Sequence, residues 1–538
     1  MRRQLAVFDD LWGLVLRNPL ATAAALAGLS ALPLLLLMPL FGAPFDRDQA
    51  VYGVIARGWR EGAIPYRDLW DNKGPVVFLW FVAAFTWLGE NIVGPRLVAA
   101  LAAGATVPFV WLSGATLLGR RAALLAALLF ATSFANLFLQ ANANAEIFML
   151  LPLAAGFWTF TQGARGRGLW WFGIAGILTA LAVLTKQSAV WTLLGYALWL
   201  GILALRNPSE RTRHLMAGVL LAAGTVLGFL PFAGYFYYHG ALGDFLYGAF
   251  GFNLVFASRY PFFLKLIPPL LWNPLPLIGG AALWFLALLG AVHLWRRGDR
   301  LAWLILLFLV FSEVAAQSLG KSSPHYNVQL LPAAALAGSV GLQVVVDRWR
   351  AGQRRLGRVA LACAAVSIAA SAFVYARPAP EDRFQVQYAL EDFLSDYAGR
   401  SVEAQEIAER VVALTEPSDY IYEFGRQSDI YFLADRRPAS RWLYNRAYDV
   451  DPSVLDEILR DLEEKRPALI LLTYECDFWT TEFRGCEDGP PAKLKTYMDQ
   501  HYTYTGSVRY ADFYVRRADA AAVGLPAPVA AGVEPVLE

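Results

Sequence analysis

Residues 20–41 read LATAAALAGLSALPLLLLMPLF, and the chain then enters PFDRDQAVYGVIARGWREGAIPYRDLWDNKGP at residues 44–75. The first stretch has no charged side chain and is long enough, at about 1.5 Å per residue, to cross a bilayer core of about 30 Å. The second stretch crowds acidic, basic and aromatic residues into one loop. This succession indicates an integral membrane protein with polar groups beside the membrane. A cleaved signal peptide is the less favoured alternative, because residues 1–18 form a long lead-in before the apolar run.

The composition supports a membrane protein. Of 538 residues, 57% are hydrophobic and 17% are charged, whereas soluble domains average about 45–50% apolar and about 25% charged residues. The net charge of +2 gives no indication of a nucleic-acid partner, so we expect none. This composition favours a chain that is embedded in lipid.

Apolar segments of spanning type recur along the chain, and we expect about eleven transmembrane helices. The segments are 20–41, 96–118, 122–139, 147–161, 169–184, 188–205, 215–236, 267–292, 301–318, 328–346 and 359–375.

Arginines divide the connections between these segments into two kinds. Every second connection is rich in them: Arg120–Arg121, Arg165/Arg167, Arg206/Arg211/Arg213, Arg296/Arg297/Arg300 and the cluster at 348–358. The positive-inside rule places these connections and the N-terminus in the cytoplasm of a plasma (inner) membrane protein. Val76–Leu88 is too short to span, and counting it would invert every later loop. We therefore expect an interfacial helix there, on the outer face.

The chain becomes polar after the last span. We divide it into a transmembrane module (1–377), a small α/β domain on the outer side (378–518) and a disordered tail (519–538). In the domain, helices are expected near 382–413 and 451–465, and strands within 419–425, 468–475 and 502–517. Cys476 and Cys486 are close enough in sequence to form a disulfide if this domain lies outside the cytosol.

The first outer loop offers two kinds of candidate residue. Asp46 followed by Gln49 fits a capping box, so Asp46 is expected to cap a helix. Asp48 then lies in the first turn and shares a helical face with Tyr52. Its carboxylate fits a general base for a hydroxyl equally as well as a partner of the helix dipole. Lys73, in the turn 71–75, is either an interfacial anchor or a ligand of a lipid phosphate.

Further polar residues fall in outer connections. Glu146, near Asn142 and Asn144, is either a favourable N-terminal charge or an oxygen ligand for a hard cation. Lys186 is either an end-cap or a site residue. Because charge at membrane depth costs several kcal/mol, the convergence of these residues on one face predicts a single cavity there. The other candidates on that face are Arg259, Lys321, His325 and Tyr326.

The motif DQAVYGVIARGWREGAIPYRDLWDNKGP resembles the first outer loop of GT-C-fold transferases, and in particular glycosyltransferase family 39. That family includes protein O-mannosyltransferases and lipid A aminoarabinose transferases. Asp48, Tyr52 and the Asp71/Lys73/Pro75 pattern match the family loop. Gln49 replaces a usual Glu, and Gly74 replaces a usual Pro. NAEIFML, GILTALAVLTKQSA and PHYNVQLLPA also resemble family segments, so that the likeness covers roughly residues 1–375.

The resemblance implies an inverting sugar transfer from a polyprenyl-phosphate donor to an envelope lipid, glycan or protein. Asp48 would be the general base, and Glu146 would hold the acceptor or, with Asp48, a divalent cation (Mg, Mn, Ca or Zn). Lys73, Arg259 and Lys186 would stabilise the leaving phosphate. Substrate contacts are expected from Tyr52, Tyr66, Asn144, Lys321, His325 and Tyr326.

Three other functions compete with this interpretation. A flippase or other transporter would need polar residues that reach both faces of the bilayer. An envelope scaffold would not depend on Asp48 or Lys73. An oligosaccharide transferase would use a diphosphate carrier.

Overall fold

The structure is a computed structural model that describes residues 15–41, 45, 47–139, 142–261, 265, 275–318, 320, 323–375, 399–473 and 490–520. The chain forms two compact units. The membrane unit comprises Met1–Ala43 and Asn72–Leu390, and the second unit comprises Pro44–Asp71 and Glu391–Glu538. Asp46, Lys321, Cys476, Cys486, residues 382–398 and residues 521–538 of the expected tail lie outside the described residues.

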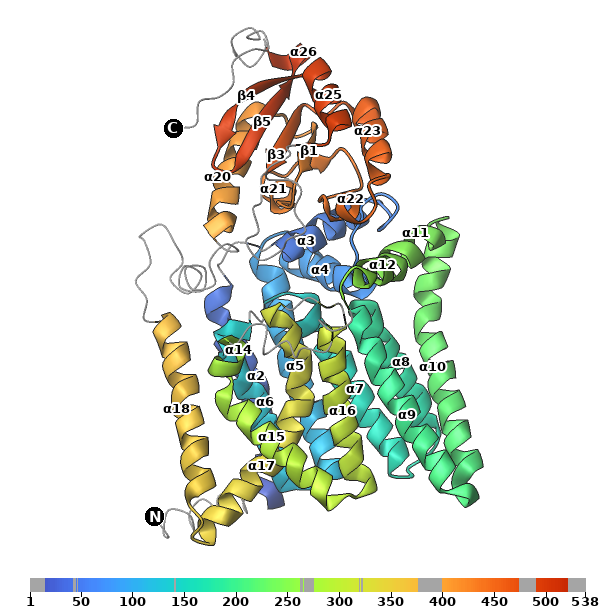
Figure 1. Cartoon of the computed structure of the whole chain (residues 1–538), viewed down its shortest axis with the longest axis vertical. Coiled ribbons are helices and arrows are strands. Elements are labelled where there is room, and N and C mark those ends of the chain that lie inside the picture. The colour runs from blue at the N-terminus through green and yellow to red at the C-terminus, as the bar shows by residue number, and fades with distance from the viewer. Residues whose placement is uncertain are drawn as a thin grey trace. The chain divides into compact units, whose positions relative to one another are not determined.

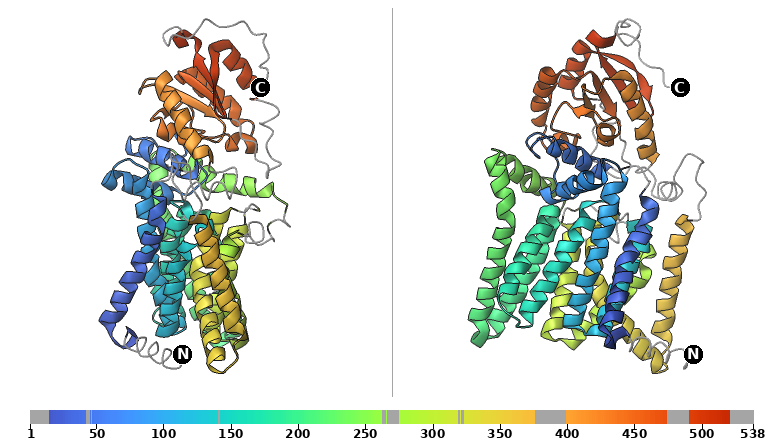
Figure 2. Two further views of the ribbon diagram at one scale, coloured as in Figure 1. Left: turned by 90° about the vertical axis from the view of Figure 1, so that its left-hand side faces the viewer. Right: turned by 180° about the vertical axis from the view of Figure 1, so that it is seen from behind.

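The membrane unit is a bundle of helices that run side by side (Figures 1 and 2). Its long helices are α2 (Pro19–Leu37), α5 (Val93–Leu117), α7 (Ala145–Ala164), α9 (Val190–Arg206), α10 (Arg211–Tyr238), α16 (Arg300–Gln317), α17 (Leu331–Arg350) and α18 (Arg355–Tyr375). Shorter helices are α4 (Pro75–Leu88), α6 (Arg120–Thr132), α8 (Trp170–Thr185), α11 (Leu242–Leu246), α12 (Phe252–Ser258), α14 (Leu275–Gly279) and α15 (Ala281–Arg297). A 3₁₀ segment, η8 (Pro324–Leu330), leads into α17.

The expectation of a polytopic helical membrane protein is confirmed. Within the described residues, eight helices are long and apolar enough to cross a membrane. Three more of the eleven expected segments contain the shorter helices α6, α8 and α15, of 13, 16 and 17 residues. Helix α4 has 14 residues, about 21 Å at 1.5 Å per residue, and is therefore shorter than a bilayer core.

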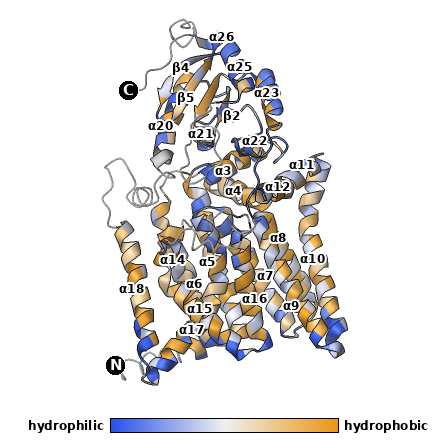
Figure 3. Cartoon of the chain, in the orientation of Figure 1, coloured by the Kyte–Doolittle hydropathy of each residue, from blue (hydrophilic) through white to orange (hydrophobic). Residues whose placement is uncertain are grey.

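The arginine-rich connections gather at one end of the bundle, where Figure 3 shows hydrophilic colour at the helix ends. Arg300 donates to the carbonyl of Ala164 at 3.0 Å, and Arg165 donates to the carbonyl of Thr116. These bonds join the ends of α5, α7 and α16. The alternation of the loops, inferred from charge alone, therefore corresponds to two chemically different ends of the unit.

Small residues let helices α8 and α10 approach closely. A Cβ added at Gly176 would lie 2.2 Å from the carbonyl oxygen of Leu221, and one at Gly224 would lie 2.0 Å from that of Gly173. Lipid gives little hydrophobic drive for helices to associate, so such backbone proximity supplies the packing instead. The stacking of α7, α8 and α10 positions the polar residues at the end of α8.

The second unit contains a five-stranded mixed sheet of order β2-β1-β3-β5-β4. The strands are β1 (Tyr420–Phe424), β2 (Arg437–Pro438), β3 (Leu469–Thr473), β4 (Tyr502–Val508) and β5 (Ala511–Arg516). Strand β1 pairs parallel with β2 and β3, and β5 pairs antiparallel with β3 and β4. Helices α20 (Gly399–Leu414), α23 (Val454–Lys465) and α25 (Ala492–His501) flank the sheet. Shorter helices are α21 (Asp429–Leu433), α22 (Arg446–Val450) and α26 (Arg517–Ala520).

The expected C-terminal α/β domain is thus confirmed. Strands β1, β3, β4 and β5 fall within the expected stretches, whereas the two-residue strand β2 was not expected. Strand β3 is buried along its whole length, as expected for a central strand covered on both faces. Helix α26 contains the first two residues, Asp519 and Ala520, of the stretch expected to be a disordered tail.

The first loop folds with the C-terminal domain, which the sequence did not indicate. Its helix α3 (Arg47–Arg60) packs against α21, and Arg57 forms a 2.9 Å ion pair with Asp435. Further along the loop, the backbone N–H of Trp70 donates to the carbonyl of Arg441 at 2.9 Å. Residues 45 and 47–71 therefore belong to the fold of the C-terminal domain.

Candidate functional site

The turn that presents Lys73 is held by amide side chains of the membrane unit. The carbonyl of Asn72 accepts hydrogen bonds from Gln187 at 3.1 Å and from Asn253 at 2.8 Å. Lys73 Nζ lies 3.2 Å from the side-chain oxygen of Asn72. The backbone at Gly74 approaches α8 so closely that an added Cβ would lie 1.9 Å from the carbonyl oxygen of Leu184. Glycine replaces the family's proline at a position where the packing leaves no room for a side chain.

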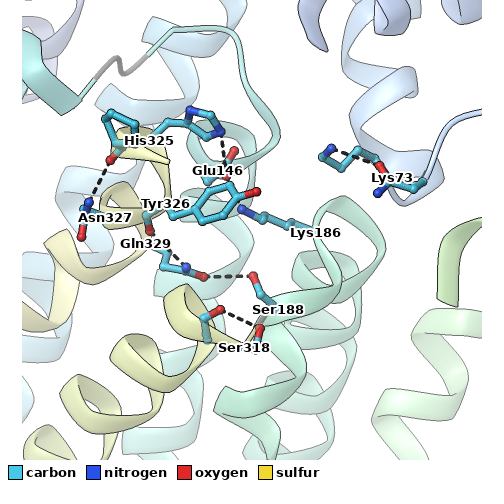
Figure 4. A network of polar contacts seen from close by, with 12 residues as sticks. Lys73, Glu146, Lys186, Ser188, Ser318, His325, Tyr326, Asn327 and Gln329 are labelled. Carbon is cyan, nitrogen blue, oxygen red and sulfur yellow. Dashed lines mark hydrogen bonds and ion pairs between the residues drawn. The ribbon is translucent and has the colours of Figure 1, made fainter. Parts of the chain in front are cut away.

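Glu146 and Lys186 form a buried ion pair (Figure 4). Glu146 lies in the first turn of α7, and Lys186 directly follows the last residue of α8. Their side chains are 2% and 6% exposed. Separating such a pair would leave a charge in a low-dielectric environment at a cost of several kcal/mol. The pair therefore ties the start of α7 to the end of α8.

Two residues of η8 complete this cluster. His325 Nε2 lies 3.7 Å from Glu146 Oε1, and Lys186 Nζ lies 3.8 Å from the centre of the Tyr326 ring. The Tyr326 ring faces the ammonium group, a cation–π arrangement that is strongest where water is excluded. We call Glu146, Lys186, His325 and Tyr326 the polar cluster. Sequence analysis singled out all four residues, and the structure brings them together.

A second layer of hydrogen bonds holds η8 in place. Ser188 Oγ donates to Gln329 Oε1 at 3.0 Å, and Gln329 Nε2 donates to the carbonyl of Tyr326 at 3.0 Å. Sequence analysis did not select Ser188 or Gln329. The segments around them were quoted only as family-like, and nothing in their spacing indicated that the two side chains would meet.

Other candidates of the membrane unit lie around the turn and the helix ends. Arg259 follows α12 and is exposed. It is six residues after Asn253, the residue bonded to Asn72, which is about 9 Å along a helix. Asn144 precedes α7 and is 3% exposed. Its Oδ1 has no hydrogen-bond partner within the described part of the chain.

In the second unit, Asp48 lies in the first turn of α3, as expected, and is half-buried. Tyr52 and Tyr66 are almost completely buried. Burial, and secondarily the charge of Asp71, hold the pKa of Tyr66 well above its usual value. Tyr66 also has a φ of 70°, which is unusual for a bulky residue. These tyrosines are therefore packed within the fold of the loop.

Asp71 is a carboxylate that sequence analysis treated as part of a turn and of the family motif, without giving it a role. It is 3% exposed, and its Oδ1 accepts a hydrogen bond of 2.5 Å from the Tyr444 hydroxyl. Burial, followed by the charge of Asp71 and more weakly that of Asp48, holds the pKa of Tyr444 well above its usual range. The two first-loop carboxylates thus both raise the pKa of one tyrosine of the C-terminal domain. The position of Asp71 in a charged loop could have marked it as a candidate site residue. Nothing in the sequence around Tyr444 could have done so.

The polar cluster contains one carboxylate, Glu146, and one histidine, His325. Among the residues with described positions, no group of three or more His, Cys, Asp or Glu side chains is arranged to hold a metal ion. The nearest cation to Glu146 is Lys186.

Part of this site lies in a segment of the chain that resembles known proteins. Residues 73–234 match the family model described as dolichyl-phosphate-mannose-protein mannosyltransferase. The family resemblance is confirmed for this part of the chain. The family segment begins at Lys73 and includes Glu146 and Lys186.

One curated relative is undecaprenyl phosphate-alpha-4-amino-4-deoxy-L-arabinose arabinosyl transferase 1 of Pseudomonas fluorescens. It is 29% identical over 316 residues, which are 52% of this chain and 51% of the relative. The chain thus spans about half the length of the curated relative that it matches.

Solved structures extend the likeness of fold to almost the whole chain. ArnT from Cupriavidus metallidurans in the apo state superposes with a TM-score of 0.59 at 14% identity, over 94% of this chain and 100% of ArnT. The same protein bound to undecaprenyl phosphate gives 0.57 at 15% identity, over 90% and 97%. The oligosaccharyltransferase AglB from Archaeoglobus fulgidus gives 0.54 at 14% identity, over 92% and 74%. The chain therefore has an ArnT-like GT-C fold and is a multi-pass integral membrane protein.

Proposed function

We propose that this protein is an inverting membrane glycosyltransferase that moves a sugar from a polyprenyl-phosphate carrier to an acceptor in the cell envelope. The observation that carries the proposal is the position of the family segment: it opens with the lysine of the 71–75 turn and contains the buried Glu146–Lys186 pair. Undecaprenyl phosphate is the ligand in one ArnT structure of the same fold, which supports a polyprenyl carrier here.

In the proposed reaction, the oxygen of an acceptor hydroxyl forms a bond to the anomeric carbon of the donor sugar. The bond from that carbon to the phosphate oxygen breaks, and the acceptor proton passes to the Asp48 carboxylate. The departing polyprenyl phosphate gains negative charge. Lys73 and Arg259 would stabilise this charge, because fixed cations act most strongly where charge develops.

The polar cluster would bind the acceptor. Glu146 would accept a hydrogen bond from the acceptor, while Lys186 and His325, which both contact its Oε1 atom, would hold the carboxylate in place. In this role Lys186 would act on the donor phosphate only indirectly, through its ion pair with Glu146. Asn144, with a buried oxygen that lacks a described partner, would receive another polar group of the substrate, and Tyr326 would form part of the wall.

We propose that the reaction takes place on the outer side of the membrane. The arginine-rich end of the bundle would face the cytoplasm, which puts the polar cluster and the C-terminal domain outside. Sugars on polyprenyl carriers would then reach the cluster from the outer leaflet.

The test is transfer of radiolabelled sugar from polyprenyl-monophosphate donors by the purified full-length protein in lipid nanodiscs. Asp48→Asn should lower kcat at least 100-fold, since a positioned general base contributes about 10²- to 10⁴-fold. The control is Asp456→Asn, which removes an exposed carboxylate of the same unit that pairs with Lys493. Normal turnover in Asp48→Asn would remove Asp48 from the mechanism. Transfer from diphosphate carriers alone would favour the oligosaccharide transferase alternative.

A further inference from the structure

The arginine-rich end of the membrane unit contains an open cavity of about 490 Å³. Its charged lining consists of Arg165, which follows α7, Arg297, the last residue of α15, and Asp299 and Arg300 at the start of α16. The volume falls within the roughly 300–1,000 Å³ that is usual for small-molecule sites. We call this cavity the arginine pocket. It joins the ends of three helices and has more positive than negative charge.

Two of the guanidinium groups are held by the backbone of a neighbouring helix. Arg300 donates to the carbonyl of Ala164 at 3.0 Å, and Arg165 donates to the carbonyl of Thr116. A guanidinium has several N–H donors in a planar fork, so a bond to one carbonyl leaves others for a second acceptor. The fork matches two oxygens of a phosphate group. Because these groups are already ordered, a bound anion would cost little additional side-chain entropy.

The aspartate of the lining does not cancel this charge. Asp299 Oδ1 accepts hydrogen bonds of 3.0 and 2.8 Å from the first backbone N–H groups of α16. Its other oxygen, Oδ2, forms an ion pair with Arg297. Asp299 is therefore engaged with its own helix and with one arginine, and the charges of Arg165 and Arg300 remain in excess.

Exposed tryptophans mark the depth of this end of the unit in the membrane. Trp295, near the end of α15, is 66% exposed, and its ring lies 5.4 Å from that of Trp303. Trp170, which begins α8, is 55% exposed and stacks on Trp171. Tryptophan is enriched where a membrane meets water. The arginine pocket therefore lies at the level of lipid headgroups, whose phosphates are the nearest abundant anions.

We propose that the arginine pocket binds the phosphate of an anionic glycerophospholipid, with Arg165 and Arg300 as its ligands and Arg297 beside them. Leu117 and Leu301, which also line the cavity, would contact the apolar part of the lipid. The proposed orientation puts this end in the cytoplasmic leaflet, where anionic lipids are found. The site is separate from the proposed reaction, because Arg165 follows Glu146 by 19 residues at the other end of α7, about 28 Å along the helix.

The experiment titrates the purified full-length protein in a neutral detergent with three probes and measures apparent Kd values by native mass spectrometry. The probes are dioctanoyl phosphatidylglycerol, which is anionic, dioctanoyl phosphatidylcholine, which is zwitterionic, and inorganic phosphate. Comparison of the two lipids tests for an anion site. Comparison with inorganic phosphate distinguishes a lipid phosphate from a soluble one.

Three variants separate the pocket from the charge of the whole end. Arg297→Gln removes one cation and breaks only an exposed ion pair, so the fold should be retained. Arg300→Lys keeps the charge but loses the planar fork. The matched control is Arg354→Gln, which removes a cation of the 348–358 cluster. The Arg354 guanidinium lies 6.0 Å from the centre of the Trp349 ring, and among the described residues it is not one that lines the arginine pocket.

We expect the wild type to bind phosphatidylglycerol at least fivefold more tightly than phosphatidylcholine. Arg297→Gln should weaken the binding of phosphatidylglycerol about fivefold, the effect expected of one basic residue beside anionic lipid. Arg300→Lys should weaken it as well, because an ammonium group cannot hold two phosphate oxygens in the same way. Arg354→Gln should change the Kd less than twofold. In nanodiscs, added phosphatidylglycerol should raise the melting temperature of the wild type more than that of Arg297→Gln.

Three results would overturn the inference. Equal binding of the two lipids by the wild type would show that there is no anion site. Equal losses in Arg297→Gln and Arg354→Gln would show that lipid responds only to the summed charge of this end. Binding of inorganic phosphate as tight as that of phosphatidylglycerol would assign the pocket to a soluble anion. None of these results bears on sugar transfer, which is tested separately through Asp48.

Discussion

Neutralising one partner of the Glu146–Lys186 pair should destabilise the membrane unit strongly. Glu146→Gln leaves the ammonium group of Lys186, whose side chain is 6% exposed, without its counter-charge. Breaking a buried pair in this way typically costs about 3–5 kcal/mol. The cation–π contact with Tyr326 remains, and such contacts contribute about 2 kcal/mol when desolvated. We therefore expect a loss near the lower end, about 3 kcal/mol.

The assay is chemical or thermal unfolding of the purified protein in nanodiscs, with sugar transfer measured on the same samples. The double variant Glu146→Gln/Lys186→Met removes both charges and should recover most of the lost stability, but transfer should stay abolished because the carboxylate is gone. Lys495→Gln is the control, since its 2.9 Å pair with Asp499 is exposed and worth less than about 1 kcal/mol. The reasoning is refuted if Glu146→Gln unfolds like the wild type, or if the double variant is no more stable than the single one.

Two other predictions concern the turn and the C-terminal domain. Gly74→Ala should destabilise the protein by about 1–3 kcal/mol, the usual cost of overpacking, because its Cβ would lie 1.9 Å from the carbonyl oxygen of Leu184. Gly218→Ala, where nothing lies within 4 Å of the added Cβ, should be neutral. Equal melting temperatures for the two variants would contradict this. Burial raises the pKa of Tyr431 and Tyr444, so their stabilisation is complete below the unfolded-state pKa of about 10 and is lost as the pH rises above it. Circular dichroism between pH 8 and 12 should therefore show stability falling above about pH 10, less steeply in Tyr444→Phe, whereas a flat profile would refute the argument.

Much of the fold could be predicted because the lipid bilayer allows a chain only a few kinds of structure. An apolar stretch of about 20 residues has few alternatives to a transmembrane helix, and arginines are enriched in the short loops on one side of the bilayer. The 206–213 and 296–300 arginine groups therefore indicated the alternation of loops that α9, α10, α15 and α16 display. In the same way, the apolar run at 468–475 predicted the central strand β3, since its residues are buried on both faces.

Part of the candidate site could be predicted for a related reason. Glu146, Lys186 and His325 stood out because charged and polar groups are costly at membrane depth and therefore rare in apolar segments. They meet because Glu146 lies at the start of α7, Lys186 follows the end of α8, and His325 lies in η8.

The contacts of Asp71 could not be predicted in this way. Tyr444 is 373 residues away in sequence, in a domain whose composition looks ordinary, and no local pattern records such a pairing. The partnership of Ser188 and Gln329 depends likewise on the geometry of η8. The role of Gly74 emerged only once the backbone of Leu184 was placed beside it.

The discontinuous make-up of the C-terminal domain bears on how the protein is made. Residues 47–71 leave the ribosome long before residues 399–520, with the whole helical bundle between them. At a synthesis rate of about 5–20 residues per second, that interval is roughly half a minute. During it, Phe45 and Trp70, both buried in the finished fold, lack the aromatic partners Phe432 and Trp442 that the C-terminal domain later supplies. Biogenesis of this protein thus includes a period in which an aromatic-rich loop has been made but cannot yet complete its core.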